Sequence, residues 1–234
     1  MAIPEWNSFI NADCMEYMKE FPDNYFDLAI IDPPYGGGKE FKRDQKKNSE
    51  NFTDYKGVER DGRGWAKKYG YKIKSWDKAP DENFFKELFR VSKNQIIWGG
   101  NYFTLPPCRC FLIWQKPFPE TFTMAMGEYA WTSFNSNSKI FKYAPQGKKG
   151  DERFHPAQKP IELYEWILGN YAKEGDTVLD THVGSASSLI ACRRSNHKYI
   201  GFEIDDEYYK LAKERLDKEC AQLNIYDFLS EGKT

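Results

Sequence analysis

A short apolar run ends abruptly at the tetrapeptide Asp32-Pro33-Pro34-Tyr35. The run, residues 28–31, is typical of a buried strand. Two successive prolines end such a strand, because they lack the backbone N–H and force an extended backbone. In open α/β sheets, ligands bind at the carboxyl ends of the strands. The tetrapeptide is therefore predicted to hold a carboxylate, a carbonyl and an aromatic ring at a ligand-binding edge.

These groups suit an exocyclic amino group on a flat heterocycle. The Asp32 carboxylate can accept one N–H bond and the Pro33 carbonyl the second, since no secondary-structure partner is expected for it. Pro34 keeps the backbone extended, and Tyr35 offers a face for stacking. A plain strand-ending turn is the alternative. We favour that alternative for D-P-P alone, but not for D-P-P-Y after an apolar strand and with a second motif downstream.

Length and composition limit the class of protein. A chain of 234 residues predicts one domain, with or without insertions. It has no run of 18 apolar residues and no basic, apolar signal sequence at its N-terminus, so we expect no membrane span. The five cysteines are scattered, which favours reduced thiols and a cytoplasmic location. Cys108 and Cys110 form a lone C-x-C, so no metal site is expected.

Charge is unevenly distributed along the chain. The net charge is only −1, yet residues 36–78 contain 13 Lys or Arg against 7 Asp or Glu. Aromatic residues are interleaved with these basic side chains, a composition that suits a polyanion with exposed bases. A solvated loop rich in Gly, Lys and Asn is the alternative. The position directly after residues 32–35 makes the two interpretations equally well supported.

The pattern along the chain alternates between strands and helices. This alternation predicts an α/β fold with a mostly parallel sheet and helices on both faces. Residues 128–134 and 139–143 are predicted to pair as a hairpin. The other predicted strands are residues 8–11, 26–31, 95–98, 110–114, 177–180 and 198–203. The predicted helices are residues 15–20, 81–92, 161–171, 185–194 and 206–220.

The second motif spans residues 176–205 and has the order strand, tight turn, helix, strand, acidic residue. Gly184 permits a close turn, and backbone N–H groups near Ser185 at the helix start favour a carboxylate ligand. Glu203 ends the following strand, where a carboxylate can bind a ribose diol. A nucleoside with a carboxylate and no pyrophosphate fits S-adenosylmethionine better than NAD, and the loop lacks G-x-G-x-x-G. The alternative is a structural turn with a solvated Glu203.

Further segments complete a resemblance to a known family. The chain resembles DNA amino-methyltransferases of the adenine-N6/cytosine-N4 family, in the permuted β-type order that puts the catalytic tetrapeptide before the cofactor loop. Residues 32–35 match the catalytic motif, and residues 176–205 match the cofactor loop and the ribose carboxylate. The other matching segments are residues 11–14 (N-A-D-C), 98–103 (W-G-G-N-Y-F), 114–116 (W-Q-K) and 155–160 (H-P-A-Q-K-P).

The resemblance implies a Rossmann-like, S-adenosylmethionine-dependent methyltransferase fold with circularly permuted motif order. It implies one domain over residues 1–234, with a basic loop insertion at about 36–80 and a target-recognition insertion at about 117–153. The catalytic residues would be Asp32, Pro33, Pro34 and Tyr35. The residues that would bind the cofactor S-adenosylmethionine are Asp13, Cys14, His155, Lys159, Asp180, Gly184, Ser185 and Glu203.

The cofactor loop departs from the family pattern at two positions. The family usually has D-P-F-x-G-S-G-T-T, whereas this chain has D-T-H-V-G-S-A-S-S at residues 180–188. Ala186 adds a methyl group where the second glycine would lie. His182 replaces an aromatic residue, and we expect it to be packed rather than catalytic.

The expected activity is methyl transfer to the N6 amino group of adenine in DNA, with the target base flipped out of the duplex. Transfer to cytosine N4 has nearly the same requirements, so D-P-P-Y only tilts the choice. A DNA-binding relative on a decayed methyltransferase fold is the third interpretation, supported only by Ala186. DNA contacts are expected from Lys46, Lys47, Lys148 and Lys149. A homodimer and a cognate restriction nuclease are open as partners.

Overall fold

A computed structural model describes residues 2–36, 52–53, 59–60, 78–118, 125–145 and 153–231. The chain divides into two compact units, Met1–Pro33 with Asp81–Thr234, and Pro34–Pro80. The second unit contains an antiparallel ribbon of β3 (Phe52–Thr53) and β4 (Glu59–Arg60), with Phe52 opposite Arg60. Within the described part of the chain, no helix has both the length and the apolar character to cross a membrane.

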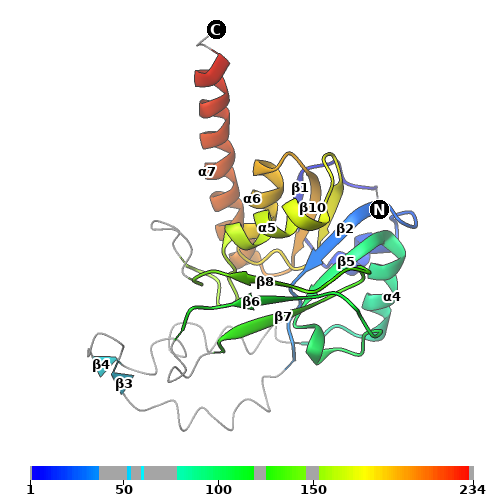
Figure 1. Cartoon of the computed structure of the whole chain (residues 1–234). Helices are drawn as coiled ribbons and strands as arrows, with labels where there is room; N and C mark the ends of the chain where they lie inside the picture. Colours follow the sequence, from blue (N-terminus) through cyan, green and yellow to red (C-terminus); the bar gives the residue numbers. More distant parts are fainter. Residues whose placement is uncertain are drawn as a thin grey trace. The chain divides into compact units, whose positions relative to one another are not determined.

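The first unit is built on an eight-stranded sheet with the order β1-β10-β9-β2-β5-β7-β6-β8 (Figure 1). Every neighbouring pair is parallel except those that involve β7, which runs antiparallel to β5 and β6. The predicted, mostly parallel α/β sheet is therefore confirmed. The strands are β1 (Ser8–Asn11), β2 (Phe26–Ile31), β5 (Ser92–Trp98), β6 (Phe111–Gln115), β7 (Gly127–Thr132), β8 (Lys139–Lys142), β9 (Thr177–Asp180) and β10 (Lys198–Glu203).

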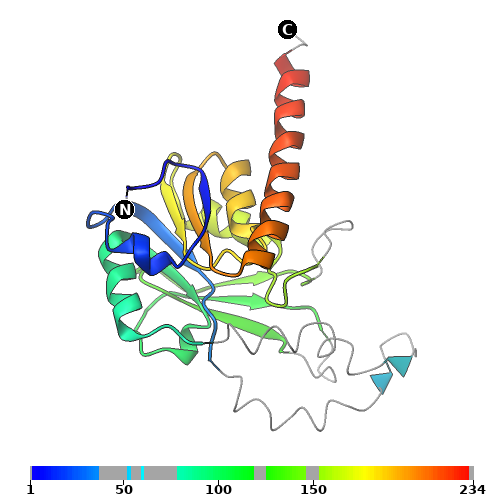
Figure 2. The same ribbon diagram turned by 180° about the vertical axis from the view of Figure 1, so that it is seen from behind.

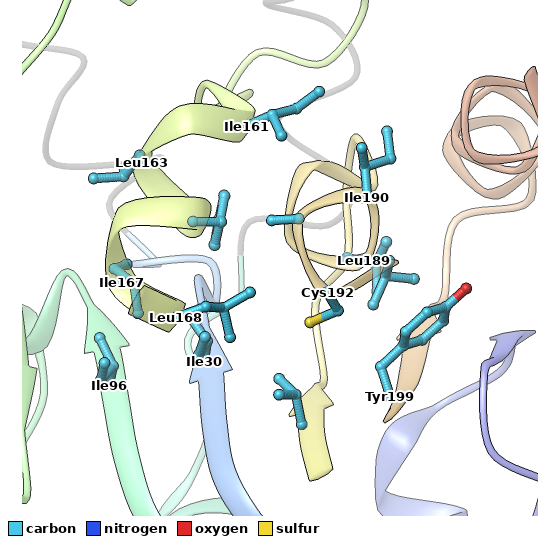
Figure 3. Close-up of a cluster of buried hydrophobic side chains, with 14 of the residues drawn as sticks. Ile30, Ile96, Ile161, Leu163, Ile167, Leu168, Leu189, Ile190, Cys192 and Tyr199 are labelled. Carbon is cyan, nitrogen blue, oxygen red and sulfur yellow. The ribbon is translucent and has the colours of Figure 1, made fainter. Parts of the chain in front are cut away.

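Helices cover both faces of this sheet (Figures 1 and 2). One buried cluster joins the sheet to α5, α6 and the first turns of α7, and a second joins the opposite face to α1 and α4. Figure 3 shows the first cluster, in which side chains of α5 and α6 pack on the strands. The helices are α1 (Cys14–Met18), α4 (Glu82–Val91), α5 (Ile161–Tyr171), α6 (Ser187–Arg194) and α7 (Asp206–Glu231), with a short 3-10 helix η2 (Gly100–Tyr102).

Strand β2 is buried on both faces because its successive side chains point to opposite sides. Leu28 and Ile30 belong to the cluster under α5 and α6, whereas Ala29 and Ile31 belong to the cluster under α1 and α4. The strand is anchored by β9 on one side and β5 on the other. This anchoring fixes the backbone that leads into Asp32.

The predicted hairpin between residues 128–134 and 139–143 is wrong. Strand β8 pairs with β6 in parallel, and β7 lies between β5 and β6. Neighbours in sequence favour a hairpin, but tertiary contacts hold β8 on the far side of β6: Trp114 Nε1 donates to the carbonyl oxygen of Tyr143 at 2.9 Å, and the Phe111 N–H donates to Ser138 Oγ at 3.2 Å. Both strands thus belong to the main sheet.

Candidate active site

The carboxyl ends of β2 and β9 meet where the strand order reverses. From β9 the chain passes through α6 to β10 on one side of the sheet, whereas α4 leads into β5 on the other side of β2. Connections that diverge in this way leave room for a ligand beyond the strand ends. Asp32 directly follows β2, and residues 181–186 directly follow β9. The two motifs found in the sequence therefore lie side by side at the switch point.

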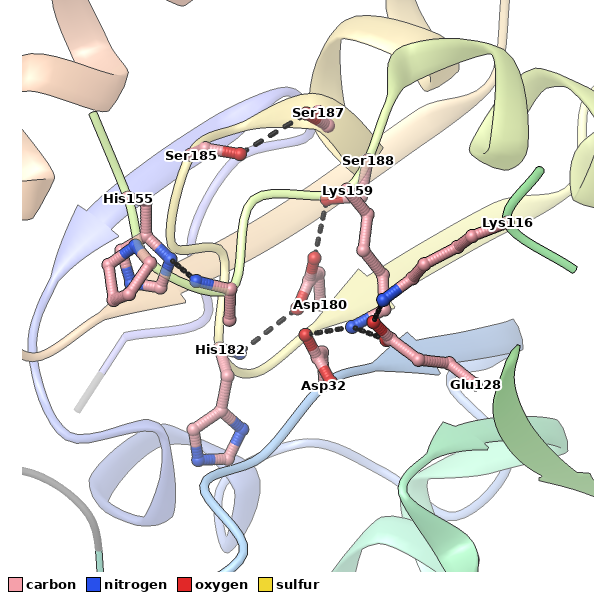
Figure 4. Close-up of polar contacts among 12 residues, drawn as sticks. Asp32, Lys116, Glu128, His155, Lys159, Asp180, His182, Ser185, Ser187 and Ser188 are labelled. Atoms are coloured by element: carbon pink, nitrogen blue, oxygen red, sulfur yellow. Dashed lines mark hydrogen bonds and ion pairs between the residues drawn. The ribbon is translucent and has the colours of Figure 1, made fainter. Parts of the chain in front are cut away.

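Asp32 forms an ion pair with Lys159, which lies in the segment just before α5. The lysine side chain is only 2% exposed and that of Asp32 12%. Lys159 Nζ also lies 3.2 Å from Oε2 of Glu128, on β7. Oε1 of Glu128 in turn accepts a hydrogen bond of 2.5 Å from Lys116, which follows β6. Figure 4 shows the Lys159 ammonium between the Asp32 and Glu128 carboxylates.

Charge pairing outweighs burial in this network. Burial on its own would lower the pKa of Lys159, but the carboxylates of Asp32 and Glu128 raise that pKa above its ordinary value. Burial would raise the pKa of Glu128, yet Lys159 and Lys116 bring it down to about 2. Lys159 also lies over the Trp98 ring, 5.2 Å from its centroid. Lys159 and Glu128 are therefore both charged at neutral pH.

Asp180 shapes the loop that follows β9. Its Oδ1 accepts the His182 N–H at 3.0 Å, and its Oδ2 accepts the Ser188 hydroxyl from the first turn of α6. Burial raises the pKa of Asp180 to about 7, and the charges of Asp32 and Glu203 act in the same direction. The carboxylate thus ties both ends of the loop to the strand end.

Glu203, at the end of β10, braces the same loop from the other side. Its Oε2 accepts the Gly184 N–H at 2.9 Å and its Oε1 accepts the Asp205 N–H at 3.0 Å. The residue is only 9% exposed, so the alternative of a solvated Glu203 is wrong. Burial is the main cause that raises its pKa above the ordinary value.

The loop has a tight, left-handed backbone at two positions. Gly184 has φ +57°, and Ala186, the residue before α6, has φ +64° and ψ +16°. A Cβ at position 184 would lie 3.2 Å from the ring of His155. Ser185 is buried, with its hydroxyl 3.2 Å from that of Ser187. Glycine at 184 is thus favoured both by its dihedral angle and by the close approach of His155.

His155 packs between the loop and α7. Its ring centroid lies 4.4 Å from that of Tyr208, and its Nδ1 accepts the Ala157 N–H at 3.3 Å. Burial, with smaller contributions from Lys159 and Arg153, lowers the pKa of His155 to about 3. The ring is therefore neutral at physiological pH.

The N-A-D-C segment lies beside Glu203. The Ala12 N–H and the Asn11 side chain both donate to the Glu203 carbonyl oxygen, at 3.2 and 2.9 Å. Asp13 caps α1 by accepting the Met15 N–H at 2.9 Å. Cys14 is buried, which raises the pKa of its thiol. This segment forms the margin of the site next to β10.

His182 packs beside the loop it belongs to. Its Nδ1 lies 2.8 Å from Thr181 Oγ1, and its ring meets that of Phe84, on α4, edge to face at 5.5 Å. Burial lowers the pKa of His182 to about 4. The side chain is thus neutral and held by packing.

The structure gathers two groups of predicted residues at one edge of the sheet. Asp32 and Lys159 form the first group, after β2. The second group surrounds the loop after β9 and consists of Asp13, Cys14, His155, Asp180, Gly184, Ser185 and Glu203. Pro33 is buried at the end of the first unit, whereas Pro34 and Tyr35 belong to the second. Lys46, Lys47, Lys148 and Lys149 lie outside the described residues.

Sequence reasoning missed Glu128 and did not foresee the ion pairs of Lys159. The expected partner of Lys159 was the cofactor, whereas its ammonium contacts Asp32 and Glu128. Lys116 lies in the W-Q-K segment that the resemblance picked out, but nothing local marked Glu128 within its strand. Its position opposite Trp114 depends on the pairing of β7 with β6, which the sequence did not show.

A separate open cavity of about 490 Å³ lies at the opposite edge of the sheet. Its wall includes Gln95 near the start of β5, residues 131–135 at the end of β7 and residues 106–109 before β6. Because these segments lie at the amino end of β5 rather than at its carboxyl end, the cavity is no part of the Asp32 site.

Comparison with known proteins identifies the family. The DNA methylase family of the N6/N4 type matches residues 67–214. The type II methyltransferase M.HpaI of Haemophilus parainfluenzae is 26% identical over 251 aligned residues, which cover 95% of this chain and 77% of that protein. The match to the family begins after residues 32–35, so the tetrapeptide is not part of the matched region.

Two solved structures share the fold. A complex of M1.HpyAVI with SAM is 21% identical, with a TM-score of 0.53 over 89% of this chain and 98% of the other. The PvuII DNA methyltransferase, described as cytosine-N4-specific, is 14% identical, with a TM-score of 0.56 over 93% of this chain and 92% of the other. With a family match over more than half of its residues, the chain belongs to the N6/N4 DNA methylases.

Proposed function

We propose that this DNA methylase transfers a methyl group from S-adenosylmethionine to the N6 amino group of adenine in DNA. One observation carries the proposal: the D-P-P-Y carboxylate, Asp32, is fixed by a buried lysine at the switch point of the sheet, next to the loop after β9. An amine acceptor and a nucleoside-binding loop at adjoining strand ends are the two parts that such a reaction needs.

The groups around the loop fit S-adenosylmethionine, which supplies an electrophilic methyl group when bound. The Glu203 oxygens accept the backbone N–H groups of Gly184 and Asp205, and a carboxylate has about four lone-pair sites in all, so a site remains for a ribose hydroxyl. Asp13 and Cys14 border the same end of β10. We infer that Glu203 binds the ribose and that the backbone of residues 183–186 lies along the rest of the cofactor.

A calorimetric titration tests this placement. Glu203→Ala should weaken S-adenosylmethionine binding by about 1.5–3 kcal/mol, the range for hydrogen bonds to a charged group. Lys173→Ala, on the loop after α5, serves as the control and should leave the affinity unchanged. Equal affinity of wild type and Glu203→Ala would put the cofactor elsewhere.

Asp32 acts on the amine rather than on the cofactor. The adenine amino nitrogen is a poor nucleophile, because its lone pair is delocalised into the ring. Hydrogen bonds from its two protons to Asp32 and to the Pro33 carbonyl favour a more pyramidal nitrogen whose lone pair is available. Positive charge then develops beside an ionised carboxylate, and positioning supplies most of the rate. After transfer, the surplus proton on the methylated nitrogen passes to water.

We assign DNA binding to two segments, residues 36–78 and residues 117–153. A base inside a duplex cannot reach a strand-end pocket, so we infer that the target flips out and stacks on Tyr35. The basic residues 36–78 would bind the DNA backbone, and residues 117–153 would select the sequence. Neutralising Lys46 and Lys47 should weaken binding to all DNA sequences and flatten its salt dependence. An unchanged salt slope would leave the basic segment without this role.

Nucleoside analysis of methylated DNA tests the proposal as a whole. DNA treated with the protein and labelled S-adenosylmethionine is digested, and the methylated nucleosides are separated by chromatography and mass. The expected product is N6-methyldeoxyadenosine, lost with Asp32→Ala although S-adenosylmethionine still binds. A product on cytosine N4 would support the alternative specificity, and near-normal turnover by Asp32→Ala would remove Asp32 from the chemistry.

A further inference from the structure

We propose that Lys159 is a positioning residue: held by Glu128 and backed by Lys116, it fixes the Asp32 carboxylate in one orientation as the acceptor for the substrate amine. The inference rests on the proposed function, because it gives Lys159 a part in the same reaction. It differs from the expectation that Lys159 binds the cofactor.

The burial of Lys159 is the first argument. Its side chain is 2% exposed, and a buried ammonium is strongly unfavourable unless it is paired and hydrogen-bonded. The groups that contact it include the Asp32 carboxylate, the Glu128 carboxylate 3.2 Å away, and the Trp98 ring at 5.2 Å. An ammonium contacted on three sides has one position, so the carboxylate bonded to it is fixed as well.

The anchoring of the network is the second argument. Lys159 approaches from the start of α5, Glu128 stands on β7, and Lys116 follows β6. The Phe118 N–H donates to the Lys116 carbonyl oxygen at 2.8 Å, and the Lys116 N–H donates to the Met126 carbonyl oxygen at 2.7 Å. Three separate elements thus support the Lys159 ammonium and, through it, Asp32, an arrangement of the kind that holds a catalytic group in place.

The charge balance is the third argument. Two carboxylates and two ammonium groups alternate from Asp32 through Lys159 and Glu128 to Lys116. The positive charge of Lys159 is shared between Asp32 and Glu128. It therefore neutralises Asp32 only in part, and the Asp32 carboxylate retains negative charge with which to accept the substrate amine. Lys116 offsets the negative charge of Glu128. Without Lys116, that negative charge would make Asp32 easier to protonate.

The sign of a pH effect follows from the groups that face Asp32. Lys159 favours its ionised form, whereas Glu128 and Asp180 disfavour it. Tyr164 and His155 also interact electrostatically with Lys159. Removing a positive partner raises the pKa of a carboxylate by about 1–3 units, so loss of Lys159 should move the acid limb of kcat upward. Loss of Glu128 should not.

The test measures kcat, KM for DNA and S-adenosylmethionine affinity from pH 5.5 to 9. Lys159→Met should lower kcat at pH 7 by about tenfold or more, move the acid limb upward, and leave S-adenosylmethionine affinity within about threefold. Lys159→Arg should restore part of kcat and the original limb. Lys116→Gln should move the limb in the same direction by less, and Glu128→Gln should move it downward.

Lys93→Met is the matched control. That lysine pairs with Asp27 at 2.7 Å near the amino ends of the strands and is 55% exposed, so its loss should leave the profile unchanged. If Lys159→Met does not fold, the opposite shifts of Lys116→Gln and Glu128→Gln decide the matter.

Two results overturn the inference alone: a Lys159→Met or Lys116→Gln profile with the wild-type limb, or a loss confined to S-adenosylmethionine affinity. Absence of methyl transfer to DNA by the wild-type protein overturns the proposed function and this inference together.

Discussion

Because the backbone at Ala186 is left-handed, we predict that the substitution Ala186→Gly leaves the free energy of unfolding almost unchanged. Ala186 is fully buried, with φ +64°, and its carbonyl oxygen accepts the Ile190 N–H at 3.0 Å as α6 begins. An L-residue in this region is disfavoured by about 1–2 kcal/mol relative to glycine, because its Cβ crowds the following carbonyl. Glycine at this position would relieve that strain without changing the turn.

The expected change in the free energy of unfolding is close to zero. Relief of about 1–2 kcal/mol opposes a loss of about 0.4–1 kcal/mol from the more flexible unfolded chain and about 0.8 kcal/mol for the buried methyl group. The control is Ala191→Gly, at an equally buried position within α6. There helix propensity costs about 1 kcal/mol and the methyl group about 0.8 kcal/mol, with no strain to relieve.

Urea denaturation followed by circular dichroism gives both values. Ala186→Gly should differ from wild type by less than about 1 kcal/mol, whereas Ala191→Gly should lose about 2 kcal/mol. Ala186→Gly should also keep S-adenosylmethionine binding. Equal destabilisation by the two substitutions would refute the reasoning about strain, and a collapse of binding would show that the loop is wrongly matched to the cofactor loop of the family.

Two other positions carry predictions. Burial raises the pKa of Asp180 from its ordinary 3.8 to about 7. The stability that Asp180 contributes is therefore fully present below about pH 4 and is lost as pH rises through 7. The free energy of unfolding of Asp180→Asn should rise relative to that of wild type between pH 4.5 and 7.5, and a difference that stays constant over this range would contradict the prediction. A Cβ at Gly201 would lie 2.7 Å from Val183 and 2.8 Å from Leu189, so Gly201→Ala should lose about 1–3 kcal/mol. A Cβ at Gly169 would have no atom within 4 Å, so Gly169→Ala should not be destabilised. Equal melting temperatures of Gly201→Ala and Gly169→Ala would refute the packing argument.

Much of the fold could be predicted from local patterns. The ranges 8–11, 26–31, 161–171, 177–180 and 198–203 match the observed elements residue for residue, because apolar periodicity and turn residues mark their ends. The position of β8 could not be predicted, since its pairing with β6 depends on contacts such as that between Trp114 and Tyr143. The order of the strands beyond β5 depends on tertiary contacts and not on local sequence patterns.

Some residues of the candidate site could likewise be predicted from the sequence, and others could not. Asp32 and Glu203 could be identified because each follows or ends an apolar strand, and parallel strands end at one edge. Glu128 could not, because its role depends on β7 running antiparallel beside β5 and β6, which places a carboxylate next to Lys159. The environment of Lys159 likewise became evident only from the packing of the segment before α5.

Sequencing that detects methylated bases in DNA from cells expressing this chain tests the central claim most directly. Parallel cultures express the wild-type chain and Asp32→Ala at equal levels. We predict N6-methyladenine at a recurring sequence context with the wild-type chain and none with Asp32→Ala. Unmethylated DNA from both cultures, or equal methylation in both, would contradict it.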